Sequence, residues 1–168
     1  MRTRAKRGTV VPDESPAIVA DVNGAAISLG PLPDFLGYAL RRAQMTVFES
    51  FTRMLAQFQL KPGDFGVLIV IDHNPGLRST DVCNALGFQK ANFAPLLQRL
   101  EGRNLVKRVS SPSDRRAQSL QLTAAGRKLL ARALQVHAEH EQDMLGNLDR
   151  EAVSRLIVQL NKLANGLE

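Results

Sequence analysis

Residues 87–106 read GFQKANFAPLLQRLEGRNLV, and apolar side chains recur in this stretch at intervals of three and four residues. This period predicts a helix over about residues 89–103 with one buried face. The side chains on that face are Phe93, Leu96, Leu97 and Leu100. Gly87 can supply the left-handed turn that follows a preceding short helix, which Ser79 or Thr80 caps. Two short helices joined by a glycine turn predict a helix-turn-helix.

A β-hairpin with a polar loop is predicted directly after this helix. Residues 105–109 form a short run with apolar residues at both ends, and polar and apolar residues alternate over residues 119–122, which is the period of a half-buried strand. The loop between them begins with the turn-forming run Ser110-Ser111-Pro112-Ser113-Asp114. The hairpin therefore follows the helix-turn-helix without a linker.

Helical periodicity continues on both sides of these elements. A long first helix is predicted over about residues 33–57, and a buried second helix begins after residues 61–63 and ends at the turn 73–76. Thr123 caps another long helix, and Asp149 caps a last one with a coiled-coil-like apolar seam. The predicted fold class is therefore mainly α with a small β-hairpin.

The composition is that of one globular domain with an excess of positive charge. The chain has 168 residues, of which 44% are hydrophobic and 23% charged, and its formal net charge is +6 at pH 7. Residues 61–122 hold 9 basic and 5 acidic side chains, whereas residues 123–168 hold 6 of each. The excess lies on the predicted helix-turn-helix and hairpin, which favours a nucleic-acid partner over a lipid surface.

The sequence also indicates a cytoplasmic protein with no membrane partner. The apolar segment 17–29 is interrupted by polar residues, and no run approaches the roughly 20 apolar residues of a membrane span. Cys83 is the single cysteine, and its apolar position favours a small core residue over an oxidation sensor. Residues 1–30 have a basic start and no sustained periodicity, which predicts a flexible basic arm.

The exposed face of the predicted helix 89–103 carries side chains that can read DNA bases. The first turn of such a helix enters the major groove, where amides pair bidentately with adenine and a lysine reaches guanine or a phosphate. The candidates are Gln89, Lys90, Asn92 and Gln98. Pro95 is expected to bend the helix because it removes a backbone donor. A merely solvated face is the alternative.

The hairpin loop carries the second group of candidate DNA contacts. They are Asp114, Arg115 and Arg116 at the tip, flanked by Lys107 and Arg108 on the strand. Two guanidinium groups on a tight tip fit the narrow, negative minor groove. Asp114 is expected to orient one arginine through a charge-assisted pair. A solvated basic loop is the alternative.

Four segments occur in an order and spacing that are specific in combination. They are residues 36–43 (LGYALRRA), 87–106, 114–116 (DRR) and 122–127 (LTAAGR). Together they resemble the MarR family of winged helix-turn-helix transcriptional regulators, over about residues 33–166. Two departures are Pro95, where members commonly carry a polar or basic residue, and Asn104, which replaces the usual glycine and tolerates the left-handed conformation.

The resemblance implies a single domain over residues 31–168. Within it, residues 60–122 form the winged helix-turn-helix, and residues 31–59 and 123–168 form the dimerisation helices. The resemblance also implies a symmetric dimer on a pseudo-palindromic operator, with half-sites about 34 Å apart and a recognition helix in each major groove. In each wing, Asp114 pairs with Arg116, which enters the minor groove.

Regulators of this family typically sense a small aromatic or phenolic anion. The resemblance implies a pocket between the dimerisation helices and the DNA-binding lobe, and the effector is expected to be such an acid or its thioester. The polar groups best placed to meet it are Tyr38, Arg41, Arg42 and His73. Intersubunit or surface hydrogen bonds are the alternative for each of them.

The sequence predicts a ligand-responsive repressor that needs no cofactor, and three other functions are its alternatives. His137, His140 and Glu141 lie one turn apart on a predicted helix, so metal sensing is conceivable. A sequence-tolerant DNA architectural protein fits the basic arm, and a large specificity ratio at physiological salt would exclude it. An enzyme is not expected, because the sequence holds no Gly-x-Ser-x-Gly elbow, His-Glu-x-x-His motif or glycine-rich phosphate loop.

Overall fold

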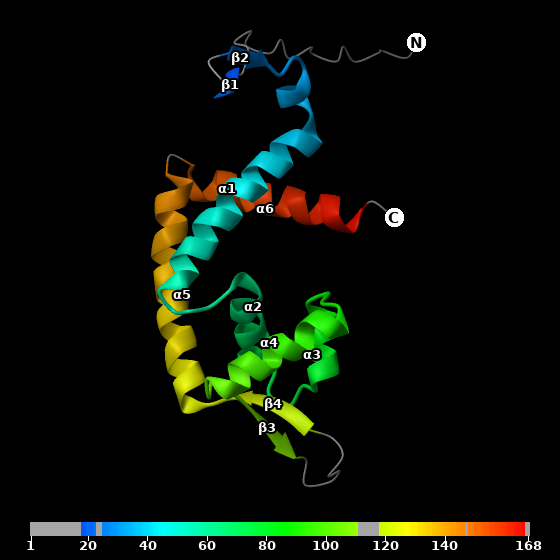
Figure 1. Cartoon of the computed structure of the whole chain (residues 1–168), viewed down its shortest axis with the longest axis vertical. Helices are drawn as coiled ribbons and strands as arrows, with labels where there is room; N and C mark the ends of the chain where they lie inside the picture. The colour runs from blue at the N-terminus through cyan, green and yellow to red at the C-terminus, as the bar shows by residue number, and fades with distance from the viewer. Residues whose placement is uncertain (1–17, 23–24, 111–117, 147, 167–168) are drawn as a thin grey trace, which may run out of the picture. The chain divides into compact units, whose positions relative to one another are not determined.

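The computed structural model describes residues 18–22, 25–110, 118–146 and 148–166 (Figure 1). The chain consists of two compact units, Met1–Thr46 (the N-terminal unit) and Val47–Glu168 (the C-terminal unit). In the N-terminal unit, β1 (Ile18–Val22) pairs antiparallel with β2 (Ala25–Ser28), and a 3-10 turn at Leu32–Asp34 follows.

This N-terminal hairpin corrects the expectation that residues 1–30 hold no strand. The signal that sequence reasoning missed is the Asn23-Gly24 dipeptide between two short apolar runs, which is typical of two-residue hairpin turns. Residues 1–17 lie outside the described part of the chain, so the flexible basic arm stays a prediction.

The helix α1 (Leu36–Ala56) begins in the N-terminal unit and ends in the C-terminal unit. The C-terminal unit continues with α2 (Pro62–His73), α3 (Ser79–Ala85), α4 (Lys90–Gly102), β3 (Val106–Ser110), β4 (Gln118–Leu122), α5 (Ala124–Leu145) and α6 (Arg150–Asn165). Each of these elements was predicted, with ends that differ by a few residues. The mainly helical fold with a small antiparallel hairpin is confirmed.

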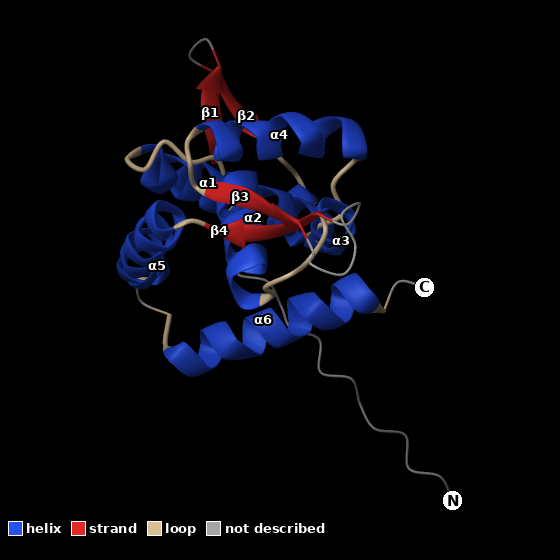
Figure 2. Ribbon diagram, turned by 90° about the horizontal axis from the view of Figure 1, so that it is seen from below, coloured by secondary structure: helices blue, strands red, loops and turns tan. Residues whose placement is uncertain are grey.

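The hairpin is joined to the helical body by its second strand. Strands β3 and β4 pair from Val106 opposite Leu122 to Ser110 opposite Gln118. The Leu120 amide donates to the carbonyl of Leu77 at 2.8 Å. The segment before α3 therefore pairs briefly with the outer edge of β4. Figure 2 shows β4 beside α2, against which it packs. The base of the wing is therefore held on two sides.

One apolar core holds α2, α3, α4, the hairpin and α5 together. Its most buried large side chains are Leu55, Val67, Leu68, Ile71, Val82, Leu97, Leu100, Leu120 and Leu130. The inward face predicted for the helix at 89–103 is confirmed, since all four of its apolar side chains are buried. Cys83 is also confirmed as a core residue, and its thiol donates to the Phe88 carbonyl.

The helix caps agree with the sequence at two of three predicted places. Thr123 Oγ1 accepts from the Gly126 amide, and Asp149 Oδ1 accepts from the Ala152 amide, as expected. For α3 the prediction is wrong, because Arg78 and not Ser79 or Thr80 is the N-cap residue. The Asp81 carboxylate accepts from the Arg78 amide at 3.0 Å, so an acid in the first turn satisfies the helix start.

Gly126 allows the close approach of α5 to the base of the hairpin. A Cβ at this position would lie 2.0 Å from the carbonyl oxygen of Leu105, and that oxygen also accepts from the Thr123 amide. We expect Gly126→Ala to lower the free energy of unfolding by about 1–3 kcal/mol or more, because the backbone must move apart.

Urea titration of the folded protein measures this change. Gly102→Ala is the matched control, since no described atom lies within 4 Å of its Cβ position. An unchanged midpoint in Gly126→Ala would show that the two backbones are not in close contact.

The C-terminal helix α6 exposes its apolar side chains. No residue of α6, which the structure describes in full, is buried. Leu156, Ile157 and Val158 are each about half exposed, and Leu160 is 37% exposed. Among the described residues, every helix is too short or too polar to cross a membrane.

Candidate functional site

The outer face of α4 presents the side chains predicted to read DNA. Gln89 is the N-cap residue of α4, and Gln89, Lys90, Asn92 and Gln98 are all exposed. The helix continues through Pro95, which lies on the same exposed face. The carbonyl of Ala91 loses its helical donor there, and solvent can hydrate it on this face. The structure thus leaves all four candidates exposed, three at the beginning of α4 and Gln98 further along its outer side.

Of the candidate DNA contacts on the hairpin, only Lys107 and Arg108 lie among the described residues. Lys107 lies exposed on β3, opposite Gln121. Arg108 Nε donates to Glu101 Oε1 at 2.7 Å, so this arginine is engaged with α4. Asp114, Arg115 and Arg116 lie outside the described residues, and their roles in the minor groove stay predictions.

An ion pair between a buried carboxylate, Asp64, and a partly exposed arginine, Arg99, joins α4 to α2. Asp64 is 1% exposed, and its Oδ1 accepts from Arg99 Nη2 at 2.5 Å. Its Oδ2 accepts from the Lys61 amide at 2.9 Å, which closes the first turn of α2. The guanidinium of Arg99 therefore points toward α2. Asp64, which sequence reasoning missed, fixes α4 against α2.

A second arginine holds the end of α4. Arg103 donates through Nη2 to the Phe58 carbonyl at 2.9 Å and through Nη1 to the Gln59 carbonyl at 2.5 Å. These carbonyls belong to the turn after α1. The next residue, Asn104, has a φ of 56°, which confirms that it adopts the left-handed conformation usually given to glycine.

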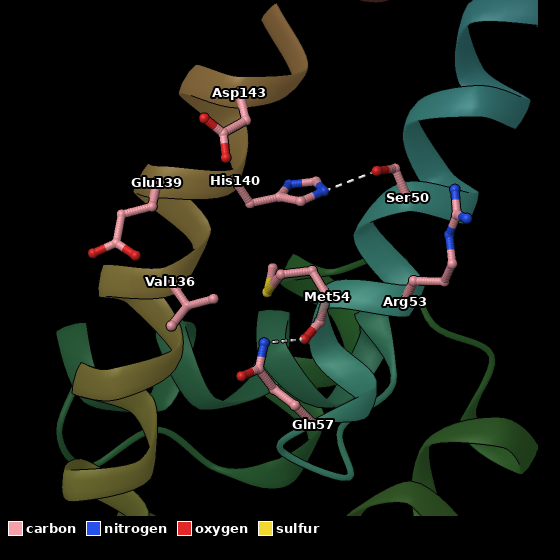
Figure 3. Close-up of a pocket in the computed structure, with 8 residues that line it drawn as sticks. All are labelled: Ser50, Arg53, Met54, Gln57, Val136, Glu139, His140 and Asp143. Carbon is pink, nitrogen blue, oxygen red and sulfur yellow. Dashed lines mark hydrogen bonds between the residues drawn. The ribbon is translucent and has the colours of Figure 1, made fainter.

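A cavity of about 420 Å³ opens between α1 and α5 (Figure 3). It is lined by Ser50, Arg53, Met54, Gln57, Val136, Glu139, His140 and Asp143. Ser50 Oγ lies 2.8 Å from His140 Nε2 and forms a hydrogen bond across the cavity. The lining is mixed, with Met54 and Val136 as apolar groups among polar side chains.

The two histidines of α5 have different surroundings, which corrects the metal hypothesis. The His137 ring packs near the rings of Phe51 and Phe65, with centroids 5.4 and 5.7 Å away, whereas His140 bonds Ser50. Glu141 is exposed. Among the described residues, no group of three or more His, Cys, Asp or Glu is placed to hold a metal ion.

The residues predicted to meet an effector do not line this cavity. Tyr38, Arg41 and Arg42 belong to the N-terminal unit, where the Arg42 guanidinium carbon lies 5.9 Å from the Tyr38 ring centroid. His73 belongs to the C-terminal unit, is exposed, and its Nδ1 bonds the Ile69 carbonyl. Their roles as effector ligands stay predictions.

Comparison with known proteins assigns this arrangement to a family. A model described as the MarR family matches residues 58–117. The putative transcriptional regulatory protein for the hcr operon of Thauera aromatica is 33% identical over 135 residues, which cover 80% of this chain and 81% of that protein. The chain belongs to the MarR family. The resemblance expected from the sequence is thereby confirmed.

Solved structures of MarR-family members extend this finding. The transcriptional repressor CouR bound to a 23-mer DNA duplex has a TM-score of 0.78 and 42% identity, covering 83% of this chain and 99% of CouR. CouR bound to p-coumaroyl-CoA has a TM-score of 0.74 and 39% identity, covering 84% of this chain and 99% of CouR. The protein is therefore a DNA-binding transcriptional regulator of the MarR type with a winged-helix fold.

In this MarR-family chain, sequence reasoning missed the polar pair in the cavity. Ser50 and His140 are 90 residues apart, so no local pattern joins them. The available signals were a serine on the face of a long amphipathic helix and the one-turn spacing of His137 and His140. Read without the fold, that spacing suggested a metal.

Proposed function

We propose that the protein is a dimeric repressor that binds a pseudo-palindromic operator and is released by an aromatic acyl thioester or a related phenolic acid. The observation that carries this proposal is the similarity to CouR, which is known with a DNA duplex and with p-coumaroyl-CoA. Both similarities extend over nearly the whole of CouR.

The described DNA-facing surface supports operator reading by α4. Its exposed amides and Lys90 project from the helix that is anchored to α2 by Asp64 and Arg99. Base readout needs a fixed helix, because each bidentate pair tolerates little displacement. We propose that Gln89, Lys90, Asn92 and Gln98 contact bases or nearby phosphates, and that Lys107 and Arg115 contact the backbone. Arg116, oriented by Asp114, enters the minor groove.

The exposed apolar face of α6 supports the homodimer. A row of large apolar side chains left in water is unfavourable, and a second copy of α6 can cover it. The dimer also suits the proposed operator, because a two-fold protein presents its two recognition helices to two half-sites.

Release follows if the effector favours a spacing of the two DNA-binding lobes that does not fit the operator. A ligand shifts such an equilibrium only by its difference in affinity for the two arrangements. The cavity between α1 and α5 supports this mechanism, since α5 begins next to the wing and α1 ends next to α2. Addition of p-coumaroyl-CoA to a complex with operator DNA is expected to dissociate it.

Base reading by α4 is tested by gel-shift titration on operator variants. We expect Asn92→Ala to weaken binding by about 1–3 kcal/mol at the base that Asn92 reads and to flatten the preference there. Arg116→Ala is expected to weaken binding to all sequences.

Gln135→Ala, an exposed amide on α5, serves as the control and is expected to bind as the wild type does. Equal losses on every operator variant for Asn92→Ala would contradict its role in base reading. Equal affinity of the wild type for operator and random DNA would instead indicate an architectural protein.

A further inference from the structure

We propose that the cavity between α1 and α5 binds the ring of a neutral hydroxyaryl acyl group, and that Ser50, held by His140, recognises the ring hydroxyl. This inference rests on the proposed function, since it specifies the effector that the repressor answers to. It assigns the recognition of the effector to residues of α1 and α5 that sequence patterns did not single out for this role.

The polar pair supplies the means of recognising a hydroxyl. Ser50 Oγ is 2.8 Å from His140 Nε2, and a serine hydroxyl has one donor and two acceptor sites. Ser50 therefore retains hydrogen-bonding capacity beyond its bond to His140. Nδ1 of His140 is buried and has no hydrogen-bond partner among the described residues. A ring hydroxyl that enters the cavity can form a hydrogen bond with Ser50 Oγ. An unsubstituted ring leaves the remaining hydrogen-bonding sites of Ser50 without a partner.

The size and apolar lining of the cavity fit one aromatic ring with a short chain. Its volume of about 420 Å³ lies in the lower part of the range of small-molecule sites. Met54 from α1 and Val136 from α5 line it. The flexible thioether of methionine makes favourable contacts with aromatic rings.

The charges around the cavity favour an acyl group over a free acid. Arg53 contributes one positive charge, and Glu139 and Asp143 contribute two negative charges. A free carboxylate would therefore meet a net negative lining. A thioester carbonyl is neutral and can accept a hydrogen bond without this repulsion, so the cavity selects the acyl part of a thioester.

The test measures release of labelled operator DNA from the full-length protein by fluorescence polarisation. The probes are p-coumaroyl-CoA, cinnamoyl-CoA, which lacks the ring hydroxyl, and free p-coumaric acid. We expect p-coumaroyl-CoA to act at a concentration about 10-fold below that of cinnamoyl-CoA, the equivalent of one lost hydrogen bond to the half-buried Ser50. Free p-coumaric acid is expected to be the weakest probe.

Two variants and a control assign this preference to the pair. Ser50→Ala and His140→Phe are expected to respond to both thioesters at similar concentrations. Glu141→Gln lies on the same helix outside the cavity lining and is expected to keep the wild-type preference. Ser50→Ala removes a single oxygen atom, so its result stands even if His140→Phe does not fold.

Two further outcomes separate this inference from the proposed function. If both thioesters release the wild type equally, or if the preference survives in Ser50→Ala, the inference is overturned and the repressor function stands. If neither thioester releases the operator at any concentration that saturates CouR, the proposed effector class fails, and the inference fails with it.

Discussion

Arg99→Met is expected to lower the free energy of unfolding by about 1–3 kcal/mol, because it leaves the buried Asp64 carboxylate without its cation. The Arg99 side chain is 39% exposed, so solvent screening keeps this cost below that of a fully buried pair. Asp64 is 1% exposed and Arg99 Nη2 is 2.5 Å from it. Asp64 still accepts from the Lys61 amide, but a single neutral donor does not replace a guanidinium. Operator affinity is expected to fall as well, since α4 loses its bond to α2. Denaturant titration and gel shift measure the two effects.

A double variant and an exposed pair provide the controls. Asp64→Asn keeps an acceptor for the Lys61 amide and removes the buried charge, so Asp64→Asn with Arg99→Met is expected to be more stable than Arg99→Met alone. Arg155→Met breaks the ion pair with Glu151, whose side chain is 80% exposed, and is expected to cost less than about 1 kcal/mol. A similarly small loss for Arg99→Met would show that α4 is not held by this pair.

Leu156→Asp is expected to convert the dimer into monomers and to weaken operator binding by about 100-fold or more. Leu156 is half exposed on α6, and the proposed two-fold contact would bury two unpaired carboxylates. Each unpaired charge costs several kcal/mol, and 1.4 kcal/mol changes a dissociation constant tenfold. Light scattering coupled to size exclusion measures the mass, and fluorescence polarisation measures the affinity for the operator.

Ser154→Asp is the matched control for this substitution. Ser154 is exposed and lies on the other side of α6 from Leu156 and Leu160, so the same charge is added beside Val158 and away from these two leucines. We expect this variant to stay dimeric. A dimer that persists in Leu156→Asp would assign the interface to another surface.

Local sequence patterns determined most of the secondary structure of this protein. The apolar period of three and four residues placed α4 and its buried face, and the short run at 105–109 together with the alternation at 119–122 placed the hairpin. Thr123 and Asp149 marked the beginnings of α5 and α6. These signals are local, because a helix face, a strand face and a cap each depend on residues that are close in sequence.

The N-terminal hairpin shows that local signals can also be overlooked. Asn23-Gly24 is a hairpin signal in the sequence, but the short apolar runs on either side of it show no sustained strand periodicity. At α3 the cap prediction failed for a related reason. Ser79 is a favourable N-cap residue, yet the Asp81 carboxylate serves the amide of Arg78 and starts the helix one residue earlier.

The sequence alone determined the family, the order of the helices and strands, and the basic character of the DNA-binding segment. Only the tertiary structure decided what the charged and polar side chains do. Arg99 pairs with Asp64, which is 35 residues away, and no local pattern indicates this partner. His140 suggested a metal until Ser50, 90 residues away, supplied its partner. Hydrogen bonds and ion pairs act over a few ångströms in space, so their partners become known only when the chain has folded.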